Sequence, residues 1–168
     1  LLSELFTTKG SGTLIRRGAA VARCDDLNGL DHGKLAHAIN RAFGRDIDPA
    51  FFSQTIDSAF LEPDFRAGAI FTRMAGQAYL SKFWVVPAAQ GDGLARDVWE
   101  RILDDVPAFF WRSRTRNPFN DWYLNACDGM QLSGDWRVFW KGLDAFDLPS
   151  AIQAAADSPD DFNPSDHS

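Results

Sequence analysis

One short stretch decides the fold: Val85-Val86-Pro87-Ala88-Ala89-Gln90-Gly91-Asp92-Gly93-Leu94-Ala95. An apolar run of strand type ends at Val86, and apolar residues recur at helical spacing after Gly93. A strand that passes directly into a helix leaves several backbone N–H groups unpaired at the helix start, where they favour a phosphate group. The glycines let the backbone approach such an anion closely. The stretch therefore predicts a phosphate-binding turn.

Two common nucleotide-binding patterns do not fit this turn. Arg96 stands where the dinucleotide fingerprint has its last glycine, and the Lys-Ser/Thr pair of a Walker loop is missing. A plain strand-to-helix connection would also need only Pro87 and the two glycines. On these residues alone that simpler alternative stays open.

The elements on either side of the turn alternate between strand and helix patterns. Strand patterns occupy residues 13–22, 67–73, 77–86, 108–114 and 137–142. Helix patterns run from Asp31 to a stop at Gly44, from Asp48-Pro49 to Phe60, from Gly93 onward, and over residues 120–126. The Ala75-Gly76 turn predicts an antiparallel hairpin. Together these elements predict a mixed α/β or α+β sheet.

Composition limits the classes of partner. The 168 residues, 45% of them hydrophobic, fit one domain with a sizeable core. With 17 basic and 23 acidic residues the formal charge is −6, which opposes broad attraction to nucleic acid or to an anionic membrane. No apolar run reaches the length of a membrane span. We expect a soluble protein that meets any bound anion with a local cluster of cations.

Cysteine and histidine usage predicts no metal site. Cys24 and Cys127 lack the spacing of a metal knuckle or a redox Cys-x-x-Cys, and the three histidines form no cluster with acidic residues. The chain ends in an acidic, proline-bearing stretch that favours disorder. We therefore expect one domain over residues 1–149 and a disordered tail over residues 150–168. The abrupt start predicts a piece of a longer chain.

Positive charge gathers on both sides of the phosphate-binding turn. Lys82 precedes it, and Arg112 and Arg114 follow it. Residues two apart in a strand share a face, so both guanidinium groups can reach one ligand. Arginine forms forked pairs with carboxylates, which favours a carboxylate-bearing substrate. A solvated strand face with surface salt bridges is the alternative on spacing alone.

The pattern Val-x-Pro-x-x-Gln-Gly-x-Gly-x-Ala over residues 85–95 resembles the pyrophosphate-binding motif of GNAT-type acetyltransferases. Residues 5–14, 79–83, 110–123 and 136–143 resemble the acetyltransferase domain of N-acetylglutamate synthase, in the class shared by vertebrate-like synthases and bifunctional bacterial synthase/kinases. The resemblance implies the GNAT fold, an α+β (mixed α/β) architecture with a central, mostly antiparallel sheet flanked by helices. The strands at 77–86 and 108–114 would splay apart.

The resemblance also implies a cofactor and a substrate, with the residues that hold them. Acetyl-CoA would be the co-substrate, with no metal, and would contact Val85, Val86, Gln90, Gly91, Gly93, Leu94, Ala95 and Asn117. L-glutamate would be held by Lys9, Lys82, Phe83, Arg112 and Arg114. Its products would be N-acetyl-L-glutamate and CoA.

The resemblance places Tyr123 and Asn117 at the thioester as catalytic residues. Tyr123 would stabilise or protonate the leaving thiolate, the alternative being a core aromatic. The matched motifs contain neither a histidine nor a carboxylate to act as base. We therefore expect direct transfer to a neutral amine whose proton leaves through water or a backbone carbonyl.

The resemblance implies an amino-acid-kinase domain in the same parent chain, a homo-oligomer, a role in arginine biosynthesis, and a cytoplasmic location, or a mitochondrial one in a eukaryote. No nucleic acid or membrane partner is expected. Two alternatives stay open: a GNAT enzyme that acts on another amine, and a non-catalytic CoA-binding or dimerisation module.

Overall fold

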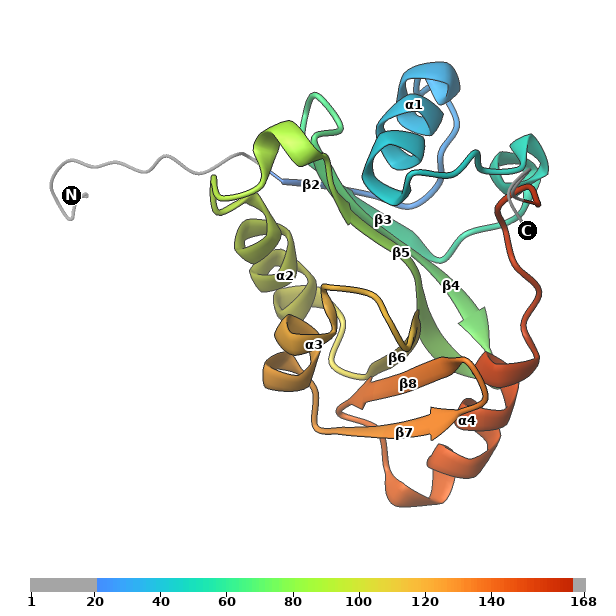
Figure 1. The fold of residues 1–168 in the computed structure, drawn as a ribbon. Coiled ribbons are helices and arrows are strands. Elements are labelled where there is room, and N and C mark those ends of the chain that lie inside the picture. Colours follow the sequence, from blue (N-terminus) through green and yellow to red (C-terminus); the bar gives the residue numbers. More distant parts are fainter. Residues whose placement is uncertain (1–20, 165–168) are drawn as a thin grey trace, which may run out of the picture.

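The computed structural model describes residues 21–164. Within this range one sheet runs in the order β2-β3-β4-β5-β6-β8-β7 (Figure 1). Every neighbouring pair is antiparallel except β5 and β6, which are parallel. The strands are β2 (Ala22–Cys24), β3 (Ser58–Leu61), β4 (Ala67–Met74), β5 (Gln77–Val85), β6 (Phe109–Arg114), β7 (Gly129–Ser133) and β8 (Trp136–Lys141).

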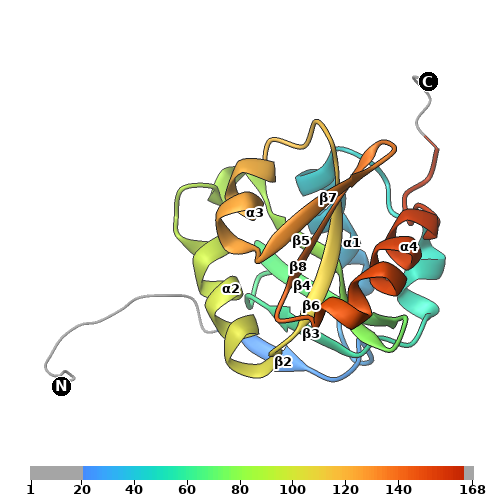
Figure 2. The same ribbon diagram turned by 90° about the horizontal axis from the view of Figure 1, so that it is seen from below.

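Helices cover both faces of this sheet. Figure 2 shows α2 and α3 on one face and α1 and α4 on the other. The α-helices are α1 (His32–Phe43), α2 (Leu94–Asp105), α3 (Asn120–Ala126) and α4 (Leu148–Asp157), and short 3-10 helices lie at η1 (Pro49–Ser53), η2 (Pro87–Ala89) and η3 (Ala145–Asp147). Within residues 21–164, no helix combines the length and the hydropathy that a bilayer crossing requires. The predicted mixed, mostly antiparallel architecture is confirmed.

Local signals in the sequence place several elements correctly. The side chain of Asp31 accepts a hydrogen bond from the Lys34 N–H at the start of α1, and Gly44 ends the helix with a φ of 67°. Ala75 and Gly76 both have positive φ and join β4 to β5 as an antiparallel hairpin. The first of the predicted strands, at residues 13–22, lies almost entirely outside the described residues.

The helix predicted from Asp48 to Phe60 is wrong beyond its first turn. Asp48 does cap η1 by accepting from the N–H of Ala50, but η1 ends at Ser53. Residues 58–61 form β3, which pairs with β2 on one edge and β4 on the other. All residues of β3 are buried, so the two sheet neighbours satisfy its backbone and outweigh its helical spacing.

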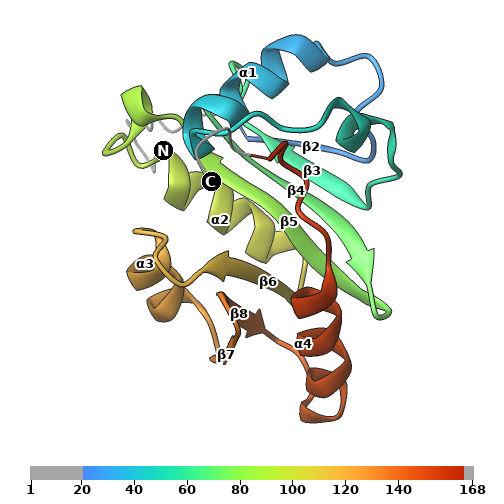
Figure 3. The same cartoon turned by 45° about the vertical axis from the view of Figure 1, so that its right-hand side comes forward.

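The disordered tail predicted from residue 150 is also wrong for the described residues. The small side chains of Ala151 and Ala155 let α4 pack closely on Tyr79, Phe110 and Val138 of the sheet. After α4 the chain crosses to the end of α1 (Figure 3). We call residues 158–163 the C-terminal strap.

The two central strands, β5 and β6, part after a short contact. Their parallel register consists of Ala78 opposite Phe109 and Tyr79 opposite Phe110. Beyond these pairs β5 stays with β4 and β6 stays with β8, so the two strands diverge (Figure 3). Ser81 forms a bulge in β5 at the place where the divergence starts. The predicted splay is confirmed.

A buried carboxylate fixes the end of β5. Glu62 is 2% exposed and accepts hydrogen bonds from the backbone N–H and the guanidinium of Arg66. The tight turn thus formed presents the carbonyl of Phe65 to the Trp84 indole and the carbonyl of Arg66 to the Val86 N–H. The turn holds β5 in place just before the phosphate-binding stretch.

Replacing Gly142 with alanine should destabilise the fold much more than the same change at Gly134. Both glycines have positive φ, which costs an L-residue about 1–2 kcal/mol. A Cβ at Gly142 would in addition overlap the carbonyl oxygen of Pro107, whereas nothing lies within 4 Å of one at Gly134. We expect the free energy of unfolding in urea to fall by roughly 3 kcal/mol or more for Gly142→Ala and by about 1 for Gly134→Ala. Equal losses would contradict this packing.

Candidate active site

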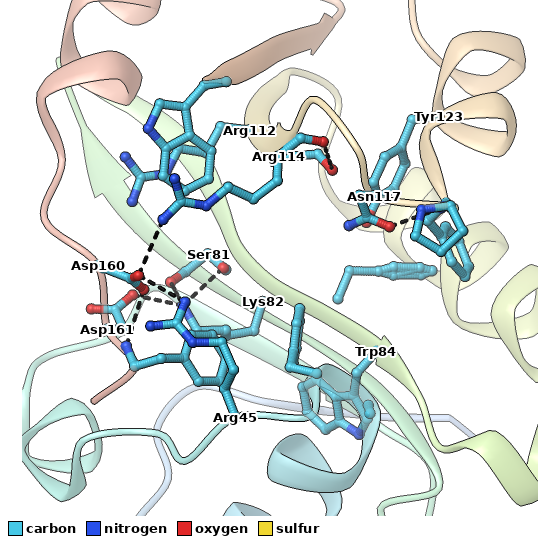
Figure 4. A pocket seen from close by; sticks show the side chains of 18 of the residues that line it. Arg45, Ser81, Lys82, Trp84, Arg112, Arg114, Asn117, Tyr123, Asp160 and Asp161 are labelled. Atoms are coloured by element: carbon cyan, nitrogen blue, oxygen red, sulfur yellow. Dashed lines mark hydrogen bonds and ion pairs between the residues drawn. The ribbon is translucent and has the colours of Figure 1, made fainter. Parts of the chain in front are cut away.

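A pocket of about 600 Å³ opens where β5 and β6 part (Figure 4). Its walls come from both strands, the loop before α3, the end of α1 and the C-terminal strap. Its lining includes eight of the predicted site residues: Lys82, Phe83, Val85, Gln90, Arg112, Arg114, Asn117 and Tyr123. Lys9 lies outside the described residues. The splay therefore brings together most of the residues that were predicted from separate motifs.

The pocket reaches both faces of the sheet. Arg112 lies on the α4 face, where its guanidinium contacts the carbonyl oxygen of Ala155. The ring of Phe83 lies on the other face, against Trp99 of α2 and Tyr123 of α3. Because the strands have separated between these side chains, one ligand can approach from each face and the two can meet in the gap.

The phosphate-binding stretch forms the predicted turn into α2. Gly91 and Gly93 have φ values of 93° and 81°, and a Cβ on either would meet no protein atom within 4 Å. Glycine is therefore favoured at both positions because the backbone has positive φ there, and not because a side chain would clash with the protein. The first hydrogen bond into the helix runs from Asp97 N–H to the Gly93 carbonyl, so the N–H groups of Leu94 and Ala95 precede the helical ladder. They are available to an anion.

The end of β5 offers one backbone donor to the gap. The N–H of Val86 donates to the carbonyl of Arg66 in the turn beside β4. It is therefore occupied, and Val86 can contact a ligand only through other atoms. Successive N–H groups of a strand point to opposite edges, so the N–H of Val85 faces β6 and the pocket.

Lys82 is a buried cation at the floor of the pocket. Its side chain is 6% exposed, and its Nζ lies 2.6 Å from Asp161 Oδ2 and 4.8 Å from the ring centroid of Phe51. Burial lowers the pKa of Lys82, and the carboxylate of Asp161 opposes that shift. The ion pair with Asp161 thus offsets part of the cost of burying this ammonium group.

Arg112 and Arg114 share one face of β6, as their spacing predicted. Both guanidinium groups stack on Trp136, with their central carbons 3.7 and 3.9 Å from its ring centroid. Arg112 also donates to the carbonyl oxygens of Ala155, Ser158 and Pro159, at the end of α4 and the start of the strap. Arg112 therefore anchors the strap, and Arg114 is the freer of the two to meet a ligand.

Sequence reasoning missed a third arginine and two carboxylates in this pocket. Arg45, just after the α1 cap, lies 2.8 Å from Asp160 Oδ2, and Arg114 lies 3.3 Å from the same oxygen. Burial would raise the pKa of Asp160, but the hydrogen bond from Arg45 and the N–H of Phe162 lower it overall. In the sequence, these residues could have been suspected only from the opposite charges of the acidic C-terminal stretch and the cations near the turn.

Tyr123 and Asn117 lie across the pocket from these charges (Figure 4). Tyr123 is 6% exposed and packs against Trp111 and Phe139. Its burial raises the pKa of Tyr123 far above the usual value, so the phenol keeps its proton. The side-chain oxygen of Asn117 accepts from the N–H of Phe119, which leaves its NH₂ group to donate to a ligand.

No group of three or more histidine, cysteine or acidic side chains within residues 21–164 is arranged to hold a metal ion. Besides the strap carboxylates of Asp160 and Asp161, the pocket offers backbone N–H groups, cations and a protonated phenol. Donors of this kind match anions and a developing oxyanion.

Comparison with known proteins identifies the family. Residues 22–158 match the family described as NAT, the N-acetyltransferase of N-acetylglutamate synthase. The chain belongs to this family. Its N-acetyltransferase domain is 42% identical, over 147 residues, to a Xylella fastidiosa protein named acetylglutamate kinase, covering 87% of this chain and 35% of the relative. It is 35% identical over 170 residues to the human mitochondrial N-acetylglutamate synthase, covering 97% of this chain and 32% of the relative.

The chain thus spans about a third of the length of these curated relatives. A solved structure of N-acetylglutamate synthase from Neisseria gonorrhoeae, complexed with coenzyme A and N-acetyl-glutamate, superposes with a TM-score of 0.54. It is 15% identical and covers 74% of this chain and 35% of that one. At that identity the likeness shows a common fold, which confirms the predicted N-acetyltransferase architecture.

Both tyrosines of this N-acetyltransferase domain, Tyr79 and Tyr123, should stay protonated until the protein unfolds. Burial raises the pKa of each far above the usual value of about 10. Such an acid stabilises the fold below its unfolded pKa, and the contribution is lost as the pH rises from there toward the folded pKa. We expect the folded protein to show no phenolate absorbance up to about pH 11.

The control is the same titration in denaturing urea, in which both residues should ionise near pH 10. The free energy of unfolding should correspondingly fall above that pH. A folded-state transition of either phenol at its ordinary pKa would contradict the burial of that side chain.

Proposed function

We propose that this chain is the domain that transfers the acetyl group of acetyl-CoA to the amine of L-glutamate. One arrangement carries the proposal: Gln90, three residues before Gly93, the cap of α2, lines the same pocket as the cation cluster, between β5 and β6. We also propose a longer parent chain with an amino-acid-kinase domain. The relative from Xylella fastidiosa is about three times as long as the matched region, and it is named acetylglutamate kinase.

Acetyl-CoA fits the side of the gap at the start of α2. The N–H groups ahead of the α2 ladder and the positive end of its macrodipole favour the pyrophosphate. The free backbone edges of β5 and β6 leave room for an extended, amide-bearing arm between them. The coenzyme A in the neisserial structure of the same fold supports this assignment.

L-glutamate fits the opposite side of the gap. Lys82 and Arg114 line the pocket as cations on different strands, so they can hold two carboxylates at once. Arg45, from the end of α1, adds a third positive charge at the same wall. The family description and the N-acetyl-glutamate named in the neisserial complex support a dicarboxylate here.

The groups in the gap account for each step of acetyl transfer. The neutral amine of glutamate attacks the thioester carbonyl, and the Val85 N–H donates to the oxygen as it becomes negative. As the carbon–sulfur bond breaks, the phenol of Tyr123 donates a hydrogen bond to the departing thiolate, which takes up a proton from water as CoA leaves. The amine loses its proton to water, because Asp160 and Asp161 are paired with cations.

A panel of amines tests the proposal. The chain should release free thiol from acetyl-CoA in the presence of L-glutamate and much less with glutamine, which lacks the second carboxylate. Turnover with an unrelated amine but not with glutamate would replace the substrate. Binding of acetyl-CoA without turnover on any amine would instead identify a non-catalytic module.

Tyr123→Phe should lower kcat by about 100-fold, because it removes the hydrogen-bond donor to the leaving thiolate but keeps the ring packing. The KM for glutamate should change little. Cys127→Ala is the matched control: burial raises the pKa of this thiol, which lies outside the pocket lining, so activity should be retained. Loss of turnover in a folded Cys127→Ala variant would overturn direct transfer in favour of an acetyl-enzyme.

A further inference from the structure

The backbone of the C-terminal strap has several anchors besides its acidic side chains, of which Asp160 Oδ1 accepts from the Phe162 N–H. At one end, Arg112 binds the carbonyl oxygens of Ser158 and Pro159. At the other end, the carbonyl of Asp161 accepts from the N–H of Asp48 at 2.8 Å, and the N–H of Asn163 donates to Asp46 at 2.7 Å. An isolated bridge between Ile47 and Phe162 lies between these two bonds. The strap is therefore a built part of the wall.

The acidic side chains of the strap face into the pocket (Figure 4). A single oxygen of Asp160 bridges Arg45 and Arg114, at 2.8 and 3.3 Å. The neighbouring Asp161 pairs with Lys82 at 2.6 Å. Both cations that we assign to the substrate carboxylates therefore already have one partner in the strap.

We propose that Asp160 is a positioning residue, which orients Arg114 for a substrate carboxylate by bridging it to Arg45. This inference rests on the proposed function, because it takes a dicarboxylate as the ligand of the cations. Asp161 holds Lys82 in the same way. The pocket keeps a volume of about 600 Å³ with the strap in place, so the strap forms a wall and does not fill the site.

Charge and exposure explain why Arg114 needs this bridge. Its side chain is 48% exposed, and a long side chain at such a position samples many rotamers. The guanidinium of Arg112 stacks on the same Trp136 ring and repels the like charge of Arg114. The carboxylate of Asp160 offsets that repulsion and fixes one edge of the guanidinium, which leaves the remaining N–H donors aimed along a defined direction.

The direction in which Asp160→Asn changes the affinity for a dicarboxylate distinguishes a positioning role from competition with the substrate. If the strap carboxylates merely occupied the substrate site, Asp160→Asn would tighten binding of a dicarboxylate, because the pocket would become more positive. If Asp160 positions Arg114, the same change weakens binding. We expect the dissociation constant of N-acetyl-L-glutamate, measured by titration calorimetry on the whole 168-residue chain, to rise about 10-fold.

Three variants sharpen the test. Asp160→Glu keeps the charge and should recover most of the affinity. Asp157→Asn, which removes an equal charge from an exposed side chain bonded only to Gln153 among the contacts described, should leave affinity within about 2-fold. In an Arg114→Ala background, Asp160→Asn should have little further effect, because its action passes through Arg114. Thermal unfolding of each variant checks that the fold is kept.

Kinetics complete the comparison. Asp160→Asn should raise the KM for glutamate, with little change in the KM for acetyl-CoA. An unchanged or tighter dissociation constant, or a full effect in the Arg114→Ala background, would overturn the positioning role even if the unmodified chain acetylates glutamate. If the unmodified chain binds N-acetyl-L-glutamate but transfers no acetyl group, the proposed function fails, and the calorimetry still decides the role of Asp160.

Discussion

The two residue pairs that join β5 to β6 are the constraint on which the site depends. With Ala78 and Tyr79 opposite Phe109 and Phe110, the strands are tied at one end only. Each then follows its other neighbour, β4 or β8, over its whole length. The inner edges that result carry backbone groups without a sheet partner, in the interior of the domain. A buried edge of this kind is costly unless a ligand or water satisfies it.

The divergence of β5 and β6 also explains how an acidic protein gathers cations at one place. The chain carries a formal charge of −6, yet the pocket brings together a lysine and several arginines. They come from the end of α1, from β5 and from β6, and the strap supplies carboxylates that partly offset them. The offset is incomplete, because the lining holds more cations than carboxylates, so this wall stays positive although the chain as a whole is acidic.

Sequence patterns predicted the elements whose cause is local. Asp31 caps the start of α1 with its side chain, Gly44 ends the helix with its positive φ, and the Ala75-Gly76 turn fixes the central hairpin. The shared face of Arg112 and Arg114 follows from strand periodicity and is confirmed by their common contact with Trp136. The turn from β5 into α2 was likewise predictable, because the positive φ angles of Gly91 and Gly93 favour glycine at both positions.

What could not be predicted depends on residues far apart in the sequence. β3 looks helical by spacing and becomes a strand because two neighbours cover its edges. Arg45 carries no motif and reaches the site only because α1 ends beside β5. The strap has the composition of a disordered tail, and its order comes from Arg112 and from the segment after α1.

The position of the strap in the chain has a consequence for biosynthesis. A ribosome makes the chain from its amino end, so Arg45, Lys82 and Arg114 all emerge before Asp160. The cations of the pocket are therefore made before the carboxylates that pair with them. Translation that stops after β8 would omit both the strap and α4, which covers Tyr79, Phe110 and Val138 of the sheet. The charge balance of this pocket is thus completed only by the last residues of the domain to be synthesised.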